Sequence, residues 1–251
     1  NGGRRTVAQV IDSLAEGAKT ALPVGIACAL VGVIIGTMTL TGAANTFGIF
    51  IVSVGENSLL LSLILTMITC IVLGMGIPTI PNYIITSSIA APALLELGVP
   101  LIVSHMFVFY FGILADLTPP VALACFAAAP IARESGFKIS LEAIKVAAAG
   151  FVIPYMAVYT PALMLQTGGP LSEAMGFPLA VVYIVVKCVL CIGLWGAAVV
   201  GWLGHRLQWW ERVLAMVAAF TLIAALPMTD EIGFALTALF AFIVWKRGRQ
   251  A

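Results

Sequence analysis

The sequence predicts an all-α polytopic membrane protein, and two observations on composition lead to that prediction. Hydrophobic residues make up 62% of the 251 residues and charged residues only 9%, with a mean hydropathy of +1.13. A soluble domain has about 45–50% apolar and about 25% charged residues, so this excess cannot be buried in a soluble core. The composition excludes a soluble enzyme, a nucleic-acid-binding protein and a disordered chain. A net charge of +1 indicates no bulk preference for acidic or basic partners.

The chain opens with an amphipathic segment. In residues 1–19 the apolar side chains recur at helical spacing, so we expect a cytoplasmic interfacial helix lying on the membrane. The segment has neither the apolar core nor the cleavage site of a signal peptide, and it begins at Asn1. We therefore expect the chain to be a fragment of a longer protein. Residues 20–41 are apolar and long enough to span the bilayer.

The next segments predict a re-entrant hairpin. Residues 43–54 are apolar but too short to span. Two apolar runs, 57–73 and 83–97, flank the sequence GMGIPTIPN at 74–82, which no straight helix tolerates. Irregular backbone survives at membrane depth only where protein or water covers it. We expect the hairpin to occupy about 57–98.

A broken transmembrane helix follows over about 99–132, interrupted by the sequence DLTPP at 116–120. After it, continuous spans are expected at about 140–165, 179–203, 213–228 and 231–245.

The distribution of Lys and Arg tests this topology. If the N-terminus is cytoplasmic, the alternation of spans leaves the C-terminus cytoplasmic as well. Eleven of the twelve Lys and Arg then lie on the cytoplasmic side, in agreement with the positive-inside rule: Arg4, Arg5, Lys19, Arg133, Lys138, Lys145, Arg206, Arg212, Lys246, Arg247 and Arg249. The remaining one, Lys187, is intramembrane; we expect it to pair with a carboxylate or to extend toward an interface.

The prolines of the broken helix remove hydrogen bonds at its centre. Pro119 and Pro120 cannot donate to the residues four before them, so we expect the carbonyls of Ala115 and Asp116 to lack their helical donors. A residue before proline avoids the helical region, so Thr118 should be extended.

The hairpin tip repeats this chemistry. Pro78 and Pro81 leave carbonyls near Gly74 and Ile77 without donors, and Ile80 should be extended.

These interruptions predict a transport site. Two helix C-terminal ends, near residues 73 and 115, present carbonyls that suit a cation. Two N-terminal ends, near Asn82 and Val121, present N–H groups and the positive end of the dipole, which suit an anion. Both kinds of end meeting at mid-membrane is typical of the coupling-ion and substrate site of a secondary transporter.

Three stretches carry a family resemblance. They are Gly76–Thr79, Ser104–Phe111 and Leu117–Ala122, all within Gly74–Ala132. This region resembles the large membrane (permease) subunit of tripartite ATP-independent periplasmic (TRAP) transporters, most of all the TAXI branch with its fused four-plus-twelve-helix permeases.

The resemblance implies an elevator-type transporter of the bacterial or archaeal inner membrane that imports organic acids. It implies coupling to Na⁺ or H⁺ and a periplasmic TAXI-type solute-binding protein as partner. Residues 20–165 would be the second inverted repeat, and 166–251 a C-terminal extension of extra helices. The first repeat would lie in the rest of the permease chain. Other branches carry an Asp where this chain has Pro78, so their ion ligands do not transfer directly.

The candidate site residues follow from the breaks and the resemblance together. For the cation we expect Gly74, Gly76, Thr79, Ala115, Asp116 and Thr118, with Thr79 and Thr118 as metal-ion ligands. For the substrate we expect Pro78, Asn82, Pro119, Pro120, Val121 and His105. Asp116 could instead have a structural role and accept hydrogen bonds from the freed N–H groups. His105 could also have a purely structural role. No cofactor beyond the coupling ion is expected.

Two other function classes remain open on sequence alone. An intramembrane enzyme could use His105 or Asp116, but the chain has no H-E-x-x-H motif and no Ser/His pair placed by a motif. An ion channel or structural subunit is the second alternative, because broken helices also build pores.

Overall fold

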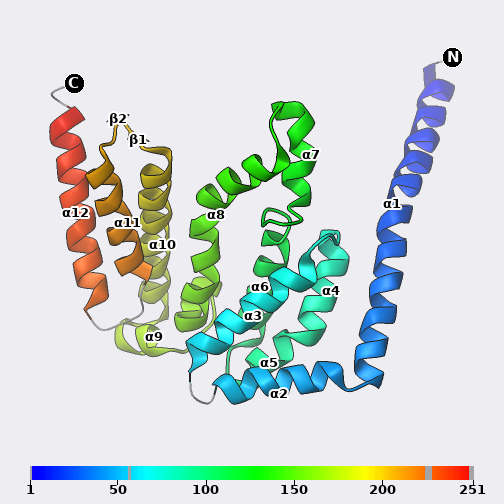
Figure 1. The fold of residues 1–251 in the computed structure, drawn as a ribbon, viewed down its shortest axis with the longest axis horizontal. Coiled ribbons are helices and arrows are strands. Elements are labelled where there is room, and N and C mark those ends of the chain that lie inside the picture. Colours follow the sequence, from blue (N-terminus) through cyan, green and yellow to red (C-terminus); the bar gives the residue numbers. More distant parts are fainter. Residues whose placement is uncertain (1, 56–57, 224–227, 249–251) are drawn as a thin grey trace.

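The computed structural model of the chain describes residues 2–55, 58–223 and 228–248, and these residues are almost entirely helical (Figure 1). The helices are α1 (Gly2–Leu40), α2 (Ala43–Gly55), α3 (Leu59–Gly74), α4 (Thr79–Ile89), α5 (Ala91–Glu96), α6 (Leu101–Leu114), α7 (Leu123–Ala132), α8 (Gly136–Tyr159), the 3-10 turn η1 (Pro161–Met164), α9 (Pro170–Met175), α10 (Phe177–Val200), α11 (Trp209–Ile223) and α12 (Thr229–Gly248). Within the described ranges the strands are two residues long: β1 (Trp202–Leu203) pairs antiparallel with β2 (His205–Arg206). The predicted all-α class is confirmed.

The helix α1 is longer than expected. It runs without a break through 39 residues, about 58 Å at 1.5 Å per residue. The expected boundary between an interfacial segment 1–19 and a span 20–41 is therefore absent from the backbone. Beyond Gly42, which has a φ of +70°, the chain turns by 72° into α2, and α2 runs across the base of the molecule (Figure 1).

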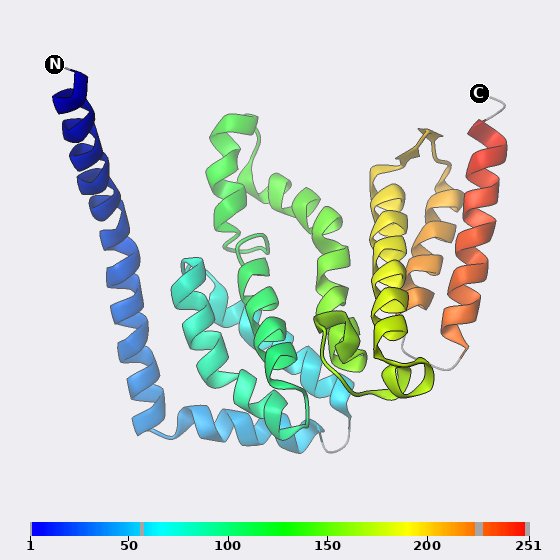
Figure 2. The ribbon, with the colours of Figure 1, turned by 180° about the vertical axis from the view of Figure 1, so that it is seen from behind.

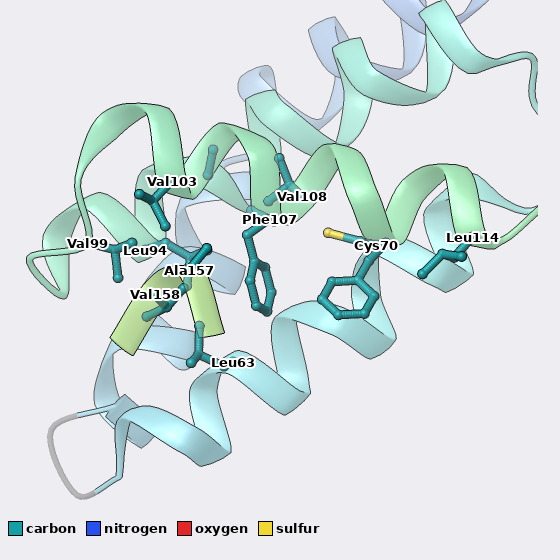
Figure 3. Close-up of a cluster of buried hydrophobic side chains, with 13 residues drawn as sticks. Leu63, Cys70, Leu94, Val99, Val103, Phe107, Val108, Leu114, Ala157 and Val158 are labelled. Carbon is teal, nitrogen blue, oxygen red and sulfur yellow. The ribbon is translucent and has the colours of Figure 1, made fainter. Parts of the chain in front are cut away.

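The core is built from the hairpin and the broken helix. The helices α3, α4 and α6 pack on one another, and α8 packs against α6. Figure 3 shows the resulting cluster of buried side chains. At its centre Phe107 and Phe111 of α6 make edge-to-face contacts with each other and with Tyr155 of α8, an arrangement that aromatic rings favour.

The last three long helices form a second bundle with its own core. The helix α11 packs against both α10 and α12, and Figure 2 shows the three side by side. The bundle joins the first part of the chain through α8 and α10: the indole Nε1 of Trp195 donates to the carbonyl of Lys145 at 3.0 Å. A small cluster of apolar side chains around Ile184 fills the same seam.

Two ion pairs hold the two ends of α12. Lys187, 5% exposed on α10, pairs with Asp230 at the start of α12, and Tyr183 donates to the other oxygen of Asp230 at 2.7 Å. At the far end, Arg247 pairs at 2.8 Å with Glu211, whose side chain is completely buried. A carboxylate partner for intramembrane Lys187 was one of the two expected outcomes.

Five of the basic residues lie at one end of the molecule. Two described helices, α8 and α10, are long and apolar enough to cross a membrane by themselves. The start of α1, the α7–α8 turn, the β1–β2 hairpin and the C-terminal end of α12 lie at one end, whereas α2 and α9 lie at the other (Figures 1 and 2). The first end carries Arg133, Lys138, Arg206, Lys246 and Arg247, and neither α2 nor α9 contains Lys or Arg. This distribution has the form that the positive-inside rule requires.

Candidate functional site

The hairpin tip is a short turn between α3 and α4. The helix α3 ends at Gly74, and α4 begins at Thr79 with Pro78 as its N-cap residue. Between them Gly76 has a φ of +77°, a conformation that glycine adopts without steric cost. The interruption therefore lies where the density of glycine and proline predicted it.

One local prediction at this tip is wrong. Ile80 is helical rather than extended, because Pro81 is the third residue of α4. The first N–H groups of a helix have no intrahelical acceptor, so a proline there costs no hydrogen bond. The first bond of α4 runs from the N–H of Asn82 to the carbonyl of Pro78 at 3.0 Å. The helix thus begins three residues before the expected start near Asn82.

The broken helix is interrupted by a tightened turn. After Leu114 the backbone continues with i→i+3 bonds, and the N–H of Thr118 reaches the carbonyl of Ala115 at 3.2 Å. Thr118 itself lies in a bend, and the peptide bond between Pro119 and Pro120 is cis. The next helix, α7, starts at residue 123, two residues after the expected position.

The expected free carbonyls are not free. The carbonyl of Ala115 accepts from Thr118, that of Asp116 accepts from the N–H of Ala124 at 3.2 Å, and that of Gly74 accepts from Ile77 at 3.4 Å. The backbone compensates for the missing proline donors with shorter 3-10 bonds and one bond across the break. Each carbonyl oxygen still has a second lone pair.

A buried amide joins the two interrupted elements. Asn82 of α4 is 1% exposed, and its Nδ2 donates to the carbonyl of Gly112 on α6 at 2.6 Å. Glycine makes this approach possible. A Cβ on Gly74 would lie 2.7 Å from the Gly112 carbonyl oxygen, and a Cβ on Gly112 would lie 2.8 Å from Asn82 Oδ1. The hairpin tip and the end of α6 are thus in close contact.

The two turns also lie close to each other. A Cβ placed on Gly76 would lie 3.8 Å from Cγ1 of Val121, an ordinary van der Waals distance. Gly76 belongs to the tip of the hairpin, and Val121 follows the two prolines of the broken helix. The structure therefore brings the two interruptions together, although 45 positions separate these residues in the numbering.

Two side-chain oxygens at this junction are buried without a hydrogen-bond partner: Asn82 Oδ1 and Asp116 Oδ1. Asp116 follows Gly112 by four residues and lies in the tightened turn just past the end of α6. A buried polar atom without a partner is costly. Oxygen ligands of this kind, an amide carbonyl and a carboxylate, are those that hard cations prefer. The two interruptions therefore present two buried oxygen atoms of the type that hard cations bind.

The hydroxyl groups predicted as ion ligands lie at the same breaks. Thr118 Oγ1 donates back to the carbonyl of Leu114 at 2.7 Å, which leaves its oxygen lone pairs free to accept. Thr79 is exposed at the first position of α4, next to exposed Pro78. Pro120 is also exposed.

His105 lies apart from the junction. Its Nδ1 is hydrogen-bonded to the hydroxyl of Tyr83 at 2.9 Å, and the two rings meet edge to face. His105 precedes Gly112 by seven residues, about 10 Å along α6. The structure gives His105 a partner on the hairpin and places Tyr83 between it and Phe109.

Sequence reasoning missed Gly112 and Tyr83. The sequence contained a signal for Gly112, because an isolated glycine inside an apolar helix usually marks a close approach of another chain segment. It contained no signal for Tyr83, since the hydrogen-bond partner of Tyr83 depends on how α4 crosses α6. Among the residues that the structure describes, no group of three His, Cys, Asp or Glu gathers as a metal-binding cluster. A cation at the junction would thus be held by amide, hydroxyl and carbonyl oxygens and the single carboxylate of Asp116.

The comparison with protein families decides the identity. Residues 2–172 match the family described as "Tripartite ATP-independent periplasmic transporter, DctM component". The chain belongs to this family. The match includes the hairpin, the broken helix and α8, and it ends within α9. No curated protein and no solved structure matches the chain.

Membership confirms the TRAP resemblance at the level of the permease component. The DctM family is a transporter family, so the protein is a TRAP permease component and not a member of an enzyme family. TRAP permeases work with a periplasmic solute-binding protein, and the family together with the apolar helices makes this a multi-pass membrane protein.

Proposed function

We propose that this TRAP permease component carries the second of two inverted transport repeats and imports an organic-acid anion with a cation gradient, of Na⁺ or H⁺, by elevator-type alternating access. Family membership supports permease function. The observation that carries the rest is the meeting of two interrupted elements, the α3–α4 hairpin tip and the break after α6, around two unpartnered oxygens.

The coupling cation would bind between Asn82 Oδ1 and Asp116 Oδ1. The hydroxyls of Thr79 and Thr118 would complete its shell, together with the backbone carbonyls of Gly74, Gly76 and Ala115. A carboxylate in a membrane interior is expensive unless a positive charge compensates for it. Binding of a cation would satisfy both orphaned oxygens at once, and it would hold the hairpin tip on the broken helix.

The anionic solute would bind at the opposite helix ends. The helices α4 and α7 both begin at the junction, at residues 79 and 123, and their first N–H groups have no intrahelical acceptors. In α7 the N–H of Ala124 already donates to the carbonyl of Asp116, which leaves that of Leu123. Such ends favour a carboxylate. Pro78, Pro119 and Pro120 would line this rim without N–H donors of their own, and Val121 would lie beside them.

The partners follow from this assignment. A periplasmic solute-binding protein of the TAXI type would deliver the solute, and the first repeat, in the rest of the permease chain, would complete the site. The basic end of the molecule would face the cytoplasm of a bacterium or archaeon, with the C-terminus inside.

Reconstituted uptake tests the proposal. The complete permease would be placed in liposomes with its binding protein, and uptake of labelled organic acids measured under separate Na⁺ and H⁺ gradients. We expect saturable uptake that requires the binding protein and one gradient. Thr118→Ala should raise the cation concentration for half-maximal uptake about tenfold, as expected for loss of one charge-assisted contact, whereas Thr118→Ser should not. Flux that ignores both gradients would contradict the proposal and favour a channel.

A further inference from the structure

The C-terminal bundle has an open apolar groove on its surface. The groove lies between α10 and α12, has a volume of about 600 Å³, and is lined on one side by Leu190 and Gly193 and on the other by Phe240, Val244 and Trp245. Both helices pack on α11. The part of α12 that lines the groove, residues 237–245, covers about 12 Å along the helix axis.

The groove runs parallel to the two helices, toward the β1–β2 hairpin. Leu203 of β1 closes this end, which is also the C-terminal end of α10 and of α12 (Figures 1 and 2). Gly193 has open space around it: a Cβ built there would meet nothing within 4 Å outside its own helix backbone. The lining is thus smooth and apolar and follows the direction in which a lipid chain lies in a bilayer.

Tryptophan marks the membrane boundary at this end. Four of the five Trp residues of the chain, Trp202, Trp209, Trp210 and Trp245, surround the β1–β2 hairpin and the end of α12, and all four are exposed. Exposed Trp is enriched at the level of the lipid headgroups. The groove therefore lies just inside the hydrocarbon region, and its mouth lies at headgroup level.

The mouth of the groove carries exposed positive charge. Arg206 and Lys246 are exposed, and within the described ranges no carboxylate pairs with either. The nearest buried carboxylate, Glu211, is already engaged by Arg247 at 2.8 Å and by the N–H of Gln208 at 2.7 Å.

We propose that this groove is a binding site for an anionic phospholipid. An acyl chain would lie between α10 and α12, and the phosphate would interact with Arg206 and Lys246. Juxtamembrane basic residues attract anionic headgroups, and an apolar groove below them accepts the chain. The site lies beyond the part of the chain that matches the TRAP family, and it does not rest on the proposed transport function.

Native mass spectrometry of the complete, delipidated permease tests this site. Phosphatidylglycerol and phosphatidylcholine of the same chain length would be titrated separately. We expect phosphatidylglycerol to bind about five- to thirtyfold more tightly, as one to two basic contacts provide. The variant Arg206→Gln/Lys246→Gln should bind the two lipids equally. Equal binding by the wild type would overturn the proposal.

The groove itself has a matched control. Gly193→Phe should fill it and reduce binding of both lipids at least tenfold. Val185→Phe adds a ring to the same helix at an exposed position that does not line the groove, and it should leave binding unchanged. Ala241→Trp provides a second blocking variant if Gly193→Phe is poorly folded. Equal effects of Gly193→Phe and Val185→Phe would overturn the proposal. An increase in oligomeric mass with no loss of lipid would also overturn it, because a second copy of the chain would then occupy the groove.

Discussion

The side-chain amide of Asn82 donates to the backbone carbonyl of Gly112 at 2.6 Å and so ties the re-entrant hairpin to the broken helix. The bond is completely buried, and it uses a carbonyl that also accepts from the N–H of Ala115 at 3.3 Å. Two elements that are each interrupted thus support one another. Binding or release of a cation beside Asn82 would act on both.

The first prediction concerns this amide. Asn82→Ala removes the donor and leaves the Gly112 carbonyl with a weaker set of bonds, so the free energy of unfolding should fall by about 1–3 kcal/mol. Thermal unfolding of the purified permease measures the change. Ser88→Ala is the control, because Ser88 lies on the same helix, is exposed and bonds only to its own Ile84 carbonyl at 2.7 Å. Identical melting temperatures for the two variants would argue against the tie.

The second prediction uses the glycines of the core. Gly74→Ala would place a Cβ 2.7 Å from the Gly112 carbonyl oxygen, which is backbone and cannot turn aside. We expect the free energy of unfolding to fall by about 1–3 kcal/mol because of overpacking. We also expect uptake to be reduced. Gly150→Ala is the matched control, because its Cβ would meet Tyr110 at a normal 3.8 Å. Higher helix propensity should make that variant neutral or slightly more stable.

Local chemistry explains which parts of this site were predictable. The positions of both interruptions follow from glycine and proline, whose effects on the backbone depend on neighbouring residues only. The hydrogen bonds of the freed carbonyls do not follow from glycine and proline alone. Ala115, Asp116 and Gly74 recover donors by tightening the turn or by reaching across the break, and this depends on the three-dimensional path of the chain.

Tertiary packing explains the remaining differences. Gly112 is a site residue because α4 packs across α6 and places Asn82 against it. The sequence alone does not show this packing. The amphipathic pattern of residues 1–19 predicted a separate interfacial helix, but helical spacing alone does not say where a helix ends. Thr20, a residue type that caps helices, and Pro23 stand at this boundary, yet α1 continues through both.

A third prediction concerns the start of α7. Ala122 is fully buried and has a φ of +40°, a left-handed conformation that costs an L-residue roughly 1–2 kcal/mol. Ala122→Gly should relieve this strain and offset the loss of one methyl group, leaving the melting temperature nearly unchanged. Ala127→Gly, at an exposed position inside α7, should cost about 1 kcal/mol. The reverse order of the two melting temperatures would show that Ala122 is unstrained.

A fourth prediction concerns the ion pair of the C-terminal bundle. Lys187→Met leaves the partly buried carboxylate of Asp230 without its cation, so unfolding should become easier by roughly 1–3 kcal/mol, below the cost of breaking a fully buried pair. The double variant Lys187→Met/Asp230→Asn should recover part of that loss. Lys138→Met breaks the exposed pair with Glu134 and should have no measurable effect. If Lys187→Met and Lys138→Met behave alike, the pair does not stabilise the bundle.

The cation site at the junction is the central claim, and equilibrium stabilisation by the ion tests it most directly. The melting temperature of the purified permease would be measured against Na⁺ at fixed pH and ionic strength, and against pH without Na⁺. Saturating Na⁺ at about 100 times its Kd should add about 2.7 kcal/mol. We predict that either Na⁺ or H⁺ raises the melting temperature of the wild type. Glu134→Gln, which removes an exposed carboxylate and serves as the control, should show the same rise. Asp116→Asn should show no rise. Coincident curves for Asp116→Asn and the wild type in both titrations would contradict the claim.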